Sequence, residues 1–197
     1  MDPLGEELRE WNVGYIQLIG YDCQNLFLQT CDQENMTGIA FTDLIAYLYQ
    51  MDKQSPIPQN VLTPTGVRFL SFMDADFYES VIQNYFNVDV TRLREHQFYD
   101  ASSHIYPYYE GGCEASDFDS SILFSKVVNA YYEESIVYLD VQALNYKQGQ
   151  GVVFTHRVVL EDVGDHYRYM GNQILEVYGT LPSYQPKLND DILNEIK

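Results

Sequence analysis

Basic side chains are scarce in this sequence: 11 Lys and Arg stand against 29 Asp and Glu in 197 residues, a formal net charge of −18. Binding a polyanion usually relies on a basic face, so the sequence argues against a nucleic-acid partner. Anionic membrane surfaces are disfavoured for the same reason. No apolar run approaches the roughly 18 residues of a membrane span, so we expect no membrane insertion of this chain.

Cysteine is rare as well. Cys23, Cys31 and Cys113 cannot form a closed disulfide framework, and no CxxC pair suggests zinc or redox chemistry. The first ten residues hold four acids and no apolar segment of the kind that a signal peptide needs. The sequence also lacks a GxSxG motif and a glycine-rich phosphate loop. We therefore predict no cofactor and no metal site, and whether the protein is an enzyme stays open.

What the chain does contain is a core. Hydrophobic residues make up 46% of it and charged residues only 20%, which is typical of a folded chain rather than a disordered one. At about this length one domain buries roughly 70% of the surface that its extended chain exposes, which suffices for stability without disulfides. No internal repeat and no convincing domain boundary is found, so we predict a single domain over residues 1–197.

The first half of the chain has helical patterns. Apolar residues recur at near-helical spacing within residues 1–52, and Thr42 is a plausible N-cap for the later of two segments. Two prolines then indicate a loop at 53–65. Residues 74–86 form one apolar stripe that Asp74 can cap, and residues 89–94 predict a short helix.

The pattern changes to strands from about residue 96. Residues 97–109 predict a hairpin, in which Pro107 has to lie on an edge or at a bulge because it cannot donate a hydrogen bond. Four strand-like runs follow, at 122–132, 135–146, 151–160 and 166–178. Their short connections join antiparallel neighbours, because a parallel crossover needs about a dozen residues.

The predicted fold class is therefore α+β. N-terminal helices pack on one face of a curved antiparallel meander sheet of about four to six strands. Residues 1–95 are the mainly helical part, residues 96–178 the antiparallel sheet, and residues 179–197 an extended C-terminal tail that ends in a helical turn near Asp190.

A family resemblance adds to this picture. The aromatic spacing Tyr85-Phe86, Leu93, Tyr99-Asp100, His104-Ile105-Tyr106, followed by a meander with Tyr167-Arg168-Tyr169, resembles the C-terminal part of uncharacterised surface lipoproteins of Gram-positive bacteria. The resemblance covers about half of the chain. It implies an exported α+β domain outside the membrane, with no catalytic residues to carry over. We therefore expect an extracellular or cell-surface address if an export signal precedes the sequence.

Tyrosine is the most unusual component, with 18 residues. Exposed tyrosines favour contacts with sugars, peptides or proteins, whereas strand tyrosines otherwise pair across the sheet and half-bury their rings. Both interpretations stay open for the grouped tyrosines. The candidate binding residues are Tyr106, Tyr108, Tyr109, Tyr167, Tyr169 and His156, the last on one face of a predicted strand.

The other titratable groups favour structural roles. His156 stands between Phe154 and Val158, where a hydrogen-bonded core histidine is the simpler interpretation than a ligand. An Asp100–His104 pair suits the closing of a turn. The acidic pairs Asp74/Asp76 and Asp117/Asp119, and the group Glu161, Asp162 and Asp165, are of the type calcium prefers, but none has EF-hand spacing.

Two functional hypotheses follow. The first is a non-enzymatic extracellular or surface-associated interaction module, whose exposed sheet face or hairpin near Tyr106, Tyr108 and Tyr109 contacts a protein, peptide or glycan. The alternative is a hydrolase or metal-dependent enzyme with a pocket between helices and sheet, for which His156 and a neighbouring acid are the candidates. The burial of these side chains and the depth of any pocket discriminate between the two.

Overall fold

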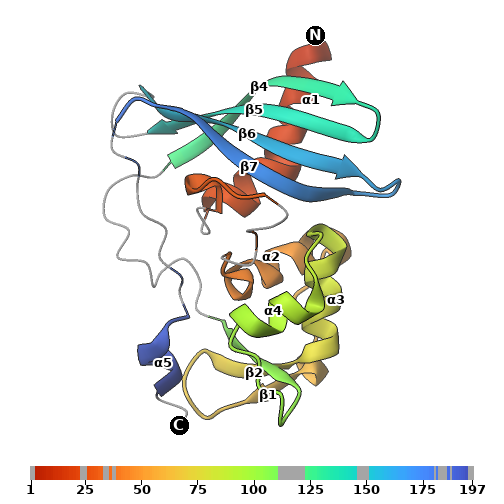
Figure 1. The fold of residues 1–197 in the computed structure, drawn as a ribbon, viewed down its shortest axis with the longest axis vertical. Helices are drawn as coiled ribbons and strands as arrows, with labels where there is room; N and C mark the ends of the chain where they lie inside the picture. Colours follow the sequence, from red (N-terminus) through yellow and green to blue (C-terminus); the bar gives the residue numbers. More distant parts are fainter. Residues whose placement is uncertain are drawn as a thin grey trace. The chain divides into compact units, whose positions relative to one another are not determined.

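The computed structural model describes residues 3–22, 26–32, 36, 39–110, 123–145, 151–179, 181, 186 and 188–194. The chain divides into two compact units: unit 1 comprises residues 1–34 and 117–184, and unit 2 comprises residues 35–116 and 185–197. Each unit combines helices with an antiparallel sheet (Figure 1). The predicted α+β class is confirmed. That residues 1–197 form one domain stays a prediction, because compactness does not measure cooperativity.

Unit 1 contains the predicted meander. Its sheet has the order β4-β5-β6-β7, and every neighbouring pair is antiparallel. Its inner face alternates with its outer face along each strand, so that Val137, Leu139 and Val141 are buried while Tyr138 and Asp140 are half-exposed. The strands are β4 (Leu123–Glu133), β5 (Ile136–Asn145), β6 (Gly151–Asp162) and β7 (Tyr167–Val177).

Helical segments cover the inner face of the meander. They are α1 (Pro3–Trp11), the π-helix η1 (Asn12–Asp22) and the short 3-10 helix η2 (Leu26–Leu28). Figure 1 shows α1 crossing the sheet on one side only. Ile16 and Ile19 of η1 are fully buried, so η1 supplies much of the apolar material that this face needs.

Both edges of the meander are partly capped. The side chains of Asn12 and Gln17 accept hydrogen bonds from the backbone N–H groups of Val127 and Ser125 on β4. On the opposite edge, Cys31 exchanges backbone hydrogen bonds of 2.8 Å with Asn172 of β7. Edge strands with unpaired backbone groups template further strands, so these contacts reduce that tendency.

Unit 2 has a second sheet that the sequence analysis did not predict. Its order is β1-β2-β3, all antiparallel, and it is accompanied by three longer helices and one short helix. The strands are β1 (Leu62–Pro64), β2 (Leu70–Asp74) and β3 (Ile105–Tyr109). The helices are α2 (Phe41–Lys53), α3 (Ala75–Tyr85), α4 (Val90–His96) and α5 (Asp190–Asn194), and the 3-10 helix η4 spans Gln59–Val61.

This second sheet corrects two predictions. The loop predicted at 53–65 contains η4 and β1, and β3 pairs with β2 rather than with residues 97–100 in a hairpin. One isolated bridge, Asp100 to Ile105, is what connects the two arms of the predicted hairpin. Pro107 does lie on the edge strand β3, as its missing N–H requires.

Helix starts were predicted with mixed success. Asp74 caps α3 by accepting a hydrogen bond of 3.0 Å from the Phe77 amide, and Asp89 accepts from two amides of α4. Thr42 is not an N-cap: the helix begins at Phe41, and the buried Thr42 hydroxyl lies 3.3 Å from the hydroxyl of Tyr78. The predicted C-terminal helical turn is α5. No helix among the described residues is long and apolar enough to span a membrane.

Candidate functional site

Tyr106 and Tyr108 do not form the exposed surface that the sequence suggested. Tyr106 is 0% exposed, its ring stacks on Tyr78 with centroids 4.1 Å apart, and its hydroxyl donates to Glu79 at 2.9 Å. Tyr108 is buried as well, and burial, with a smaller contribution from Glu110, raises its pKa to about 12. The two side chains lie two residues apart on β3, so they point to the same face of the strand, and that face is covered within unit 2.

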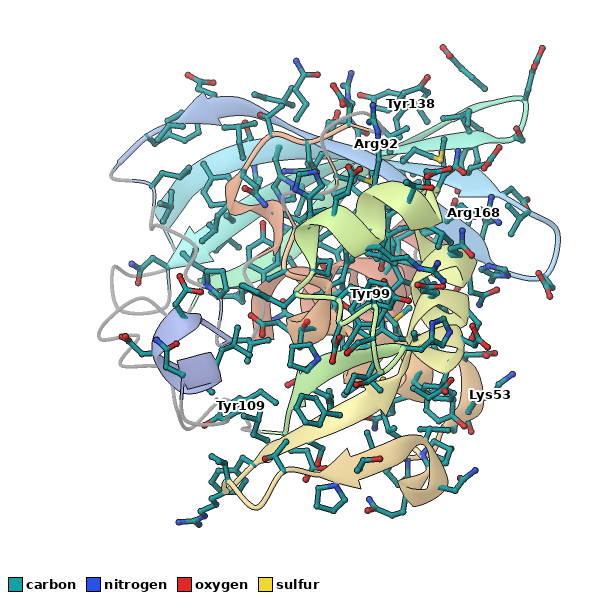
Figure 2. All side chains as sticks on the ribbon, turned by 60° about the horizontal axis from the view of Figure 1, so that its bottom comes forward. Lys53, Arg92, Tyr99, Tyr109, Tyr138 and Arg168 are labelled. Carbon is teal, nitrogen blue, oxygen red and sulfur yellow. The ribbon has the colours of Figure 1, made fainter. Side chains whose placement is uncertain are left out.

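Tyr109 is the one half-exposed tyrosine of this strand. Its ring meets that of Phe69 edge-on, with centroids 6.3 Å apart. In Figure 2 it lies at the end of β3, well away from Tyr99. One partly covered ring does not make the three-tyrosine surface that was predicted.

Glu79 organises the centre of unit 2. This buried carboxylate accepts two hydrogen bonds from Arg94, at 2.7 and 2.9 Å, besides the one from Tyr106. The Arg94 guanidinium also lies 4.9 Å from the centroid of the Tyr99 ring. A buried carboxylate with a bidentate arginine and a phenol is well satisfied, which indicates a structural network.

His156 lies in a buried network of unit 1. The side chain is 0% exposed and is enclosed by the rings of Tyr21, Phe27 and Phe154. Its Nε2 lies 2.5 Å from the Tyr21 hydroxyl, and its Nδ1 lies 2.6 Å from Oδ1 of Asn172. Both ring nitrogens are therefore occupied by protein groups.

The proton positions in this network follow from Asn172. Its Nδ2 donates to the carbonyls of Phe27 and Gln29, so its Oδ1 is an acceptor and Nδ1 of His156 carries the proton. The neutral ring then accepts from the Tyr21 hydroxyl. Burial lowers the pKa of His156 to about 4, which the hydrogen bond to Asn172 offsets only in part. Burial also raises the pKa of Tyr21 well above its ordinary value. The network is closed to a substrate, so His156 is not placed as a catalytic base.

A different histidine is accessible. His104 Nε2 lies 2.9 Å from Oδ1 of Asp76, and its Nδ1 lies 2.8 Å from the hydroxyl of Tyr99. The His104 side chain is 44% exposed. His104 has a φ of 55°, and Phe98 in the same turn has 58°, in the left-handed region that non-glycine residues rarely adopt. Figure 2 shows Tyr99 near α3 and α4.

The acidic groups proposed for calcium serve turns and ion pairs where they are described. Asp76 pairs with His104, Asp165 with His166, and Glu161 lies 3.8 Å from Arg168. Asp117 and Asp119 lie outside the described residues, as do Cys23 and Cys113. Cys31 is a free, buried thiol whose pKa burial raises to about 11. Within the described ranges no three His, Cys, Asp or Glu side chains gather as a metal site would need.

The remaining predicted residues, Tyr167 and Tyr169, lie on the helix side of β7. Tyr169 is buried and donates its hydroxyl proton to the carbonyl of Tyr15 at 2.7 Å. Tyr167 is half-buried and contacts two rings edge-on, Trp11 at 4.7 Å and Tyr15 at 5.4 Å between centroids. Tyr167 thus belongs to a cluster that the sequence analysis did not identify.

We call this group the Trp11 cluster: Trp11, Tyr15, Tyr132 and Tyr167. Trp11 Nε1 donates to the hydroxyl of Tyr132 at 3.0 Å, and this hydroxyl in turn donates to a carboxylate oxygen of Glu7. The Tyr132 side chain is nonetheless 55% exposed. Its orientation is therefore set by two hydrogen bonds while its ring stays open to solvent.

Two carboxylates border the Trp11 cluster. Glu7 is bonded to Tyr132, and burial together with the charge of Asp162 raises the pKa of both Tyr15 and Tyr167. Asp162 is the cross-strand partner of Tyr167 between β6 and β7, so the two side chains lie on the same face of the sheet. In the described part of the chain, neither Glu7 nor Asp162 forms an ion pair with a lysine or an arginine.

A groove among the described residues of unit 2 has a volume of about 220 Å³. The two charged side chains in it, Asp52 and Lys53, pair with each other at 2.7 Å, so the charges of the groove compensate each other. The groove is lined by Leu48, Tyr49, Asp52, Lys53, Ser80, Val81, Asn84 and Tyr85. It lacks the paired, converging groups expected of an active site.

Part of the Trp11 cluster had a signal in the sequence. Glu7, Trp11 and Tyr15 follow one another at four-residue spacing, which places them on one side of a helix. Tyr132 had no such signal in the sequence. It joins the cluster only because β4 pairs with β5 in the register that sets Tyr132 opposite Val137, and because β5 in turn pairs with β6.

The fold and these clusters define a tyrosine-rich α+β protein with two antiparallel sheets. The chain belongs to the DUF6070 family, a family of unknown function, which it matches over residues 1–187. No curated protein matches the chain. No solved structure matches it either.

Proposed function

We propose that the protein is a non-enzymatic interaction module and that its contact surface is the Trp11 cluster. The observation that carries the proposal is Tyr132, whose ring is exposed while its hydroxyl is held by Trp11 and Glu7. A side chain that is already ordered loses little rotamer freedom on binding, so more of its contact energy contributes to affinity. Tyrosine and tryptophan are also the residues most often found at binding hot spots.

The capped edges of the meander support this assignment. A partner strand would need free backbone groups, whereas side chains and Cys31 occupy part of both edges. A surface of aromatic side chains is then a better candidate for a protein, peptide or glycan partner than strand addition.

The test is a screen of peptide and glycan arrays with the wild-type chain and two variants. Tyr132→Ala is expected to lose the interactions that the wild type makes, because it removes the exposed ring. Tyr178→Ala is the matched control, since Tyr178 is 56% exposed in the same unit but is bonded to Glu176 at the other end of β7. Wild-type interactions that survive Tyr132→Ala unchanged would refute the proposed surface.

We also propose an extracellular or cell-surface address for the protein. This rests on the resemblance to surface lipoproteins of Gram-positive bacteria. Protease treatment of intact cells that express the protein from its own gene tests it. Digestion without lysis is expected, and protection until lysis would contradict it.

One observation supports the hydrolase alternative: the side chains of Asp76, His104 and Tyr99 form a row joined by hydrogen bonds. In such a row a histidine held by a carboxylate can accept a proton from the tyrosine hydroxyl. His104, not His156, would be the base. Turnover of p-nitrophenyl acetate that is lost in both His104→Gln and Tyr99→Phe would favour this alternative, and equal rates in all three proteins would remove it.

A further inference from the structure

The chemistry around the Trp11 cluster selects a particular partner. The rings of Trp11, Tyr15 and Tyr167 pack against one another with centroids 4.7 to 5.5 Å apart in tilted and edge-on arrangements. This close packing leaves no gap between Trp11, Tyr15 and Tyr167 into which a separate group could insert. A partner must therefore lie across the outer faces of the rings.

The border of the cluster is acidic. Glu7 accepts a hydrogen bond from Tyr132, and Asp162 is the cross-strand partner of Tyr167 between β6 and β7. Arg9 is the only cation of α1, and two positions from Glu7 it is turned by about 200° around the helix. Carboxylates next to exposed rings attract a cation in two ways, through ion pairing and through the negative face of the ring.

The net charge of the whole chain also favours a cationic partner. A net charge of −18 raises the local concentration of cations and speeds their association. It also repels anionic lipids and nucleic acids. The occupant with matching chemistry is an extended chain that carries several positive charges.

We infer that the Trp11 cluster binds a lysine- or arginine-rich segment of a partner protein, an inference that rests on the proposed interaction function. Cationic side chains of the segment lie on the ring of Tyr132 and pair with Glu7 and Asp162. The aliphatic stems of lysine and arginine cover the exposed parts of the Tyr15 and Tyr167 rings.

The test uses decalysine as the probe. Fluorescein-labelled decalysine is titrated with the full chain and followed by anisotropy, and the emission of Trp11, the single tryptophan, reports whether the peptide reaches the cluster. We expect binding that weakens as NaCl is added, and a change in tryptophan emission. A glycine-serine peptide of the same length is expected not to bind.

The chain offers a matched pair of control variants. Tyr178 donates its hydroxyl proton to Glu176 at 2.7 Å, as Tyr132 does to Glu7, so each pair joins one exposed ring to one carboxylate. Tyr132→Ala and Glu7→Gln are each expected to weaken decalysine binding by about tenfold. Tyr178→Ala and Glu176→Gln should change it less than about twofold. Tyr132→Phe keeps the ring but loses both hydrogen bonds that order it, so it should bind more weakly than the wild type and more tightly than Tyr132→Ala, which separates loss of the surface from loss of the fold.

Each contrary result has a definite meaning. Equal losses in the two matched pairs would show attraction by the total charge only and would overturn the inference. Displacement of decalysine from the wild type by CaCl₂, added at the same concentration of positive charge as the peptide, would also overturn the inference. If an uncharged peptide or a glycan binds through Tyr132 while decalysine does not, the cationic partner is wrong and the interaction module stands. If no probe or array member binds through Tyr132, the proposed function fails with it.

Discussion

Acidification is expected to destabilise the protein through His156. This side chain is fully buried, neutral and hydrogen-bonded on both nitrogens, with its pKa lowered by burial to about 4. In the unfolded chain the pKa returns to about 6.5. Between these values the unfolded state binds a proton that the folded state does not, so stability falls as pH decreases below about 6.5.

The magnitude follows from the two pKa values. One unit of pKa difference corresponds to about 1.4 kcal/mol, so the full effect is about 3 kcal/mol, nearly all of it between pH 6.5 and 4. Folded proteins have free energies of unfolding of about 5 to 15 kcal/mol, so a loss of this size is a large share of the total.

The assay is urea unfolding at a series of pH values, followed by the fluorescence of Trp11, which lies in the same unit as His156. Carboxylates titrate near the lower end of the range, so the quantity to compare is the difference between the wild type and His156→Gln. Glutamine can donate to Asn172 and accept from Tyr21 without titrating. The free energy of unfolding of the wild type, relative to that of His156→Gln, should fall by about 3 kcal/mol between pH 7 and pH 4.

His96→Gln provides the control, because His96 is exposed at the end of α4. Its unfolding free energy should run parallel to that of the wild type across the series. A constant difference between the wild type and His156→Gln from pH 7 to pH 4 would refute the reasoning, because a buried neutral histidine must give up stability when the unfolded chain is protonated.

Four further predictions concern stability. Arg94→Met leaves Glu79 buried without its bidentate partner and should lower the free energy of unfolding by about 2 to 3 kcal/mol in urea titrations, with part of the loss recovered when Glu79→Met is added; full additivity would contradict the network. A Cβ at Gly171 would lie 2.8 Å from a backbone oxygen, so Gly171→Ala should cost about 2 kcal/mol, whereas Gly14→Ala, with nothing within 4 Å, should change stability by no more than about 1 kcal/mol. Modest NaCl should raise the melting temperature because it screens the net charge of −18; a steady fall with added salt would count against this. If residues 1–197 fold as one domain, tryptophan fluorescence and far-UV circular dichroism should give the same thermal midpoint, and separated midpoints would instead favour two domains.

Local features were predictable from the sequence. The four strands of the meander were expected within a few residues of their bounds, because alternating burial and short connections are properties of neighbouring residues. The cap at Asp74 and the short helix after Asp89 were predicted for the same reason, since a capping side chain bonds to amides two or three residues away. The buried, hydrogen-bonded state favoured for His156 also followed from its apolar neighbours.

Only the tertiary structure decided the rest. The pairing of β2 with β3 joins residues more than thirty positions apart, and periodicity carries no information about which distant strand supplies the partner. Tyr106 and Tyr132 have similar sequence surroundings in tyrosine-rich strands, yet one is buried on Tyr78 and the other is exposed beside Trp11. The sequence determined the four strands of the meander and the starts of α3 and α4, because these depend on local contacts. The packing of α1 and η1 on the meander decided which of its tyrosines face solvent, and α3 covers Tyr106 in unit 2, because burial depends on what covers each face.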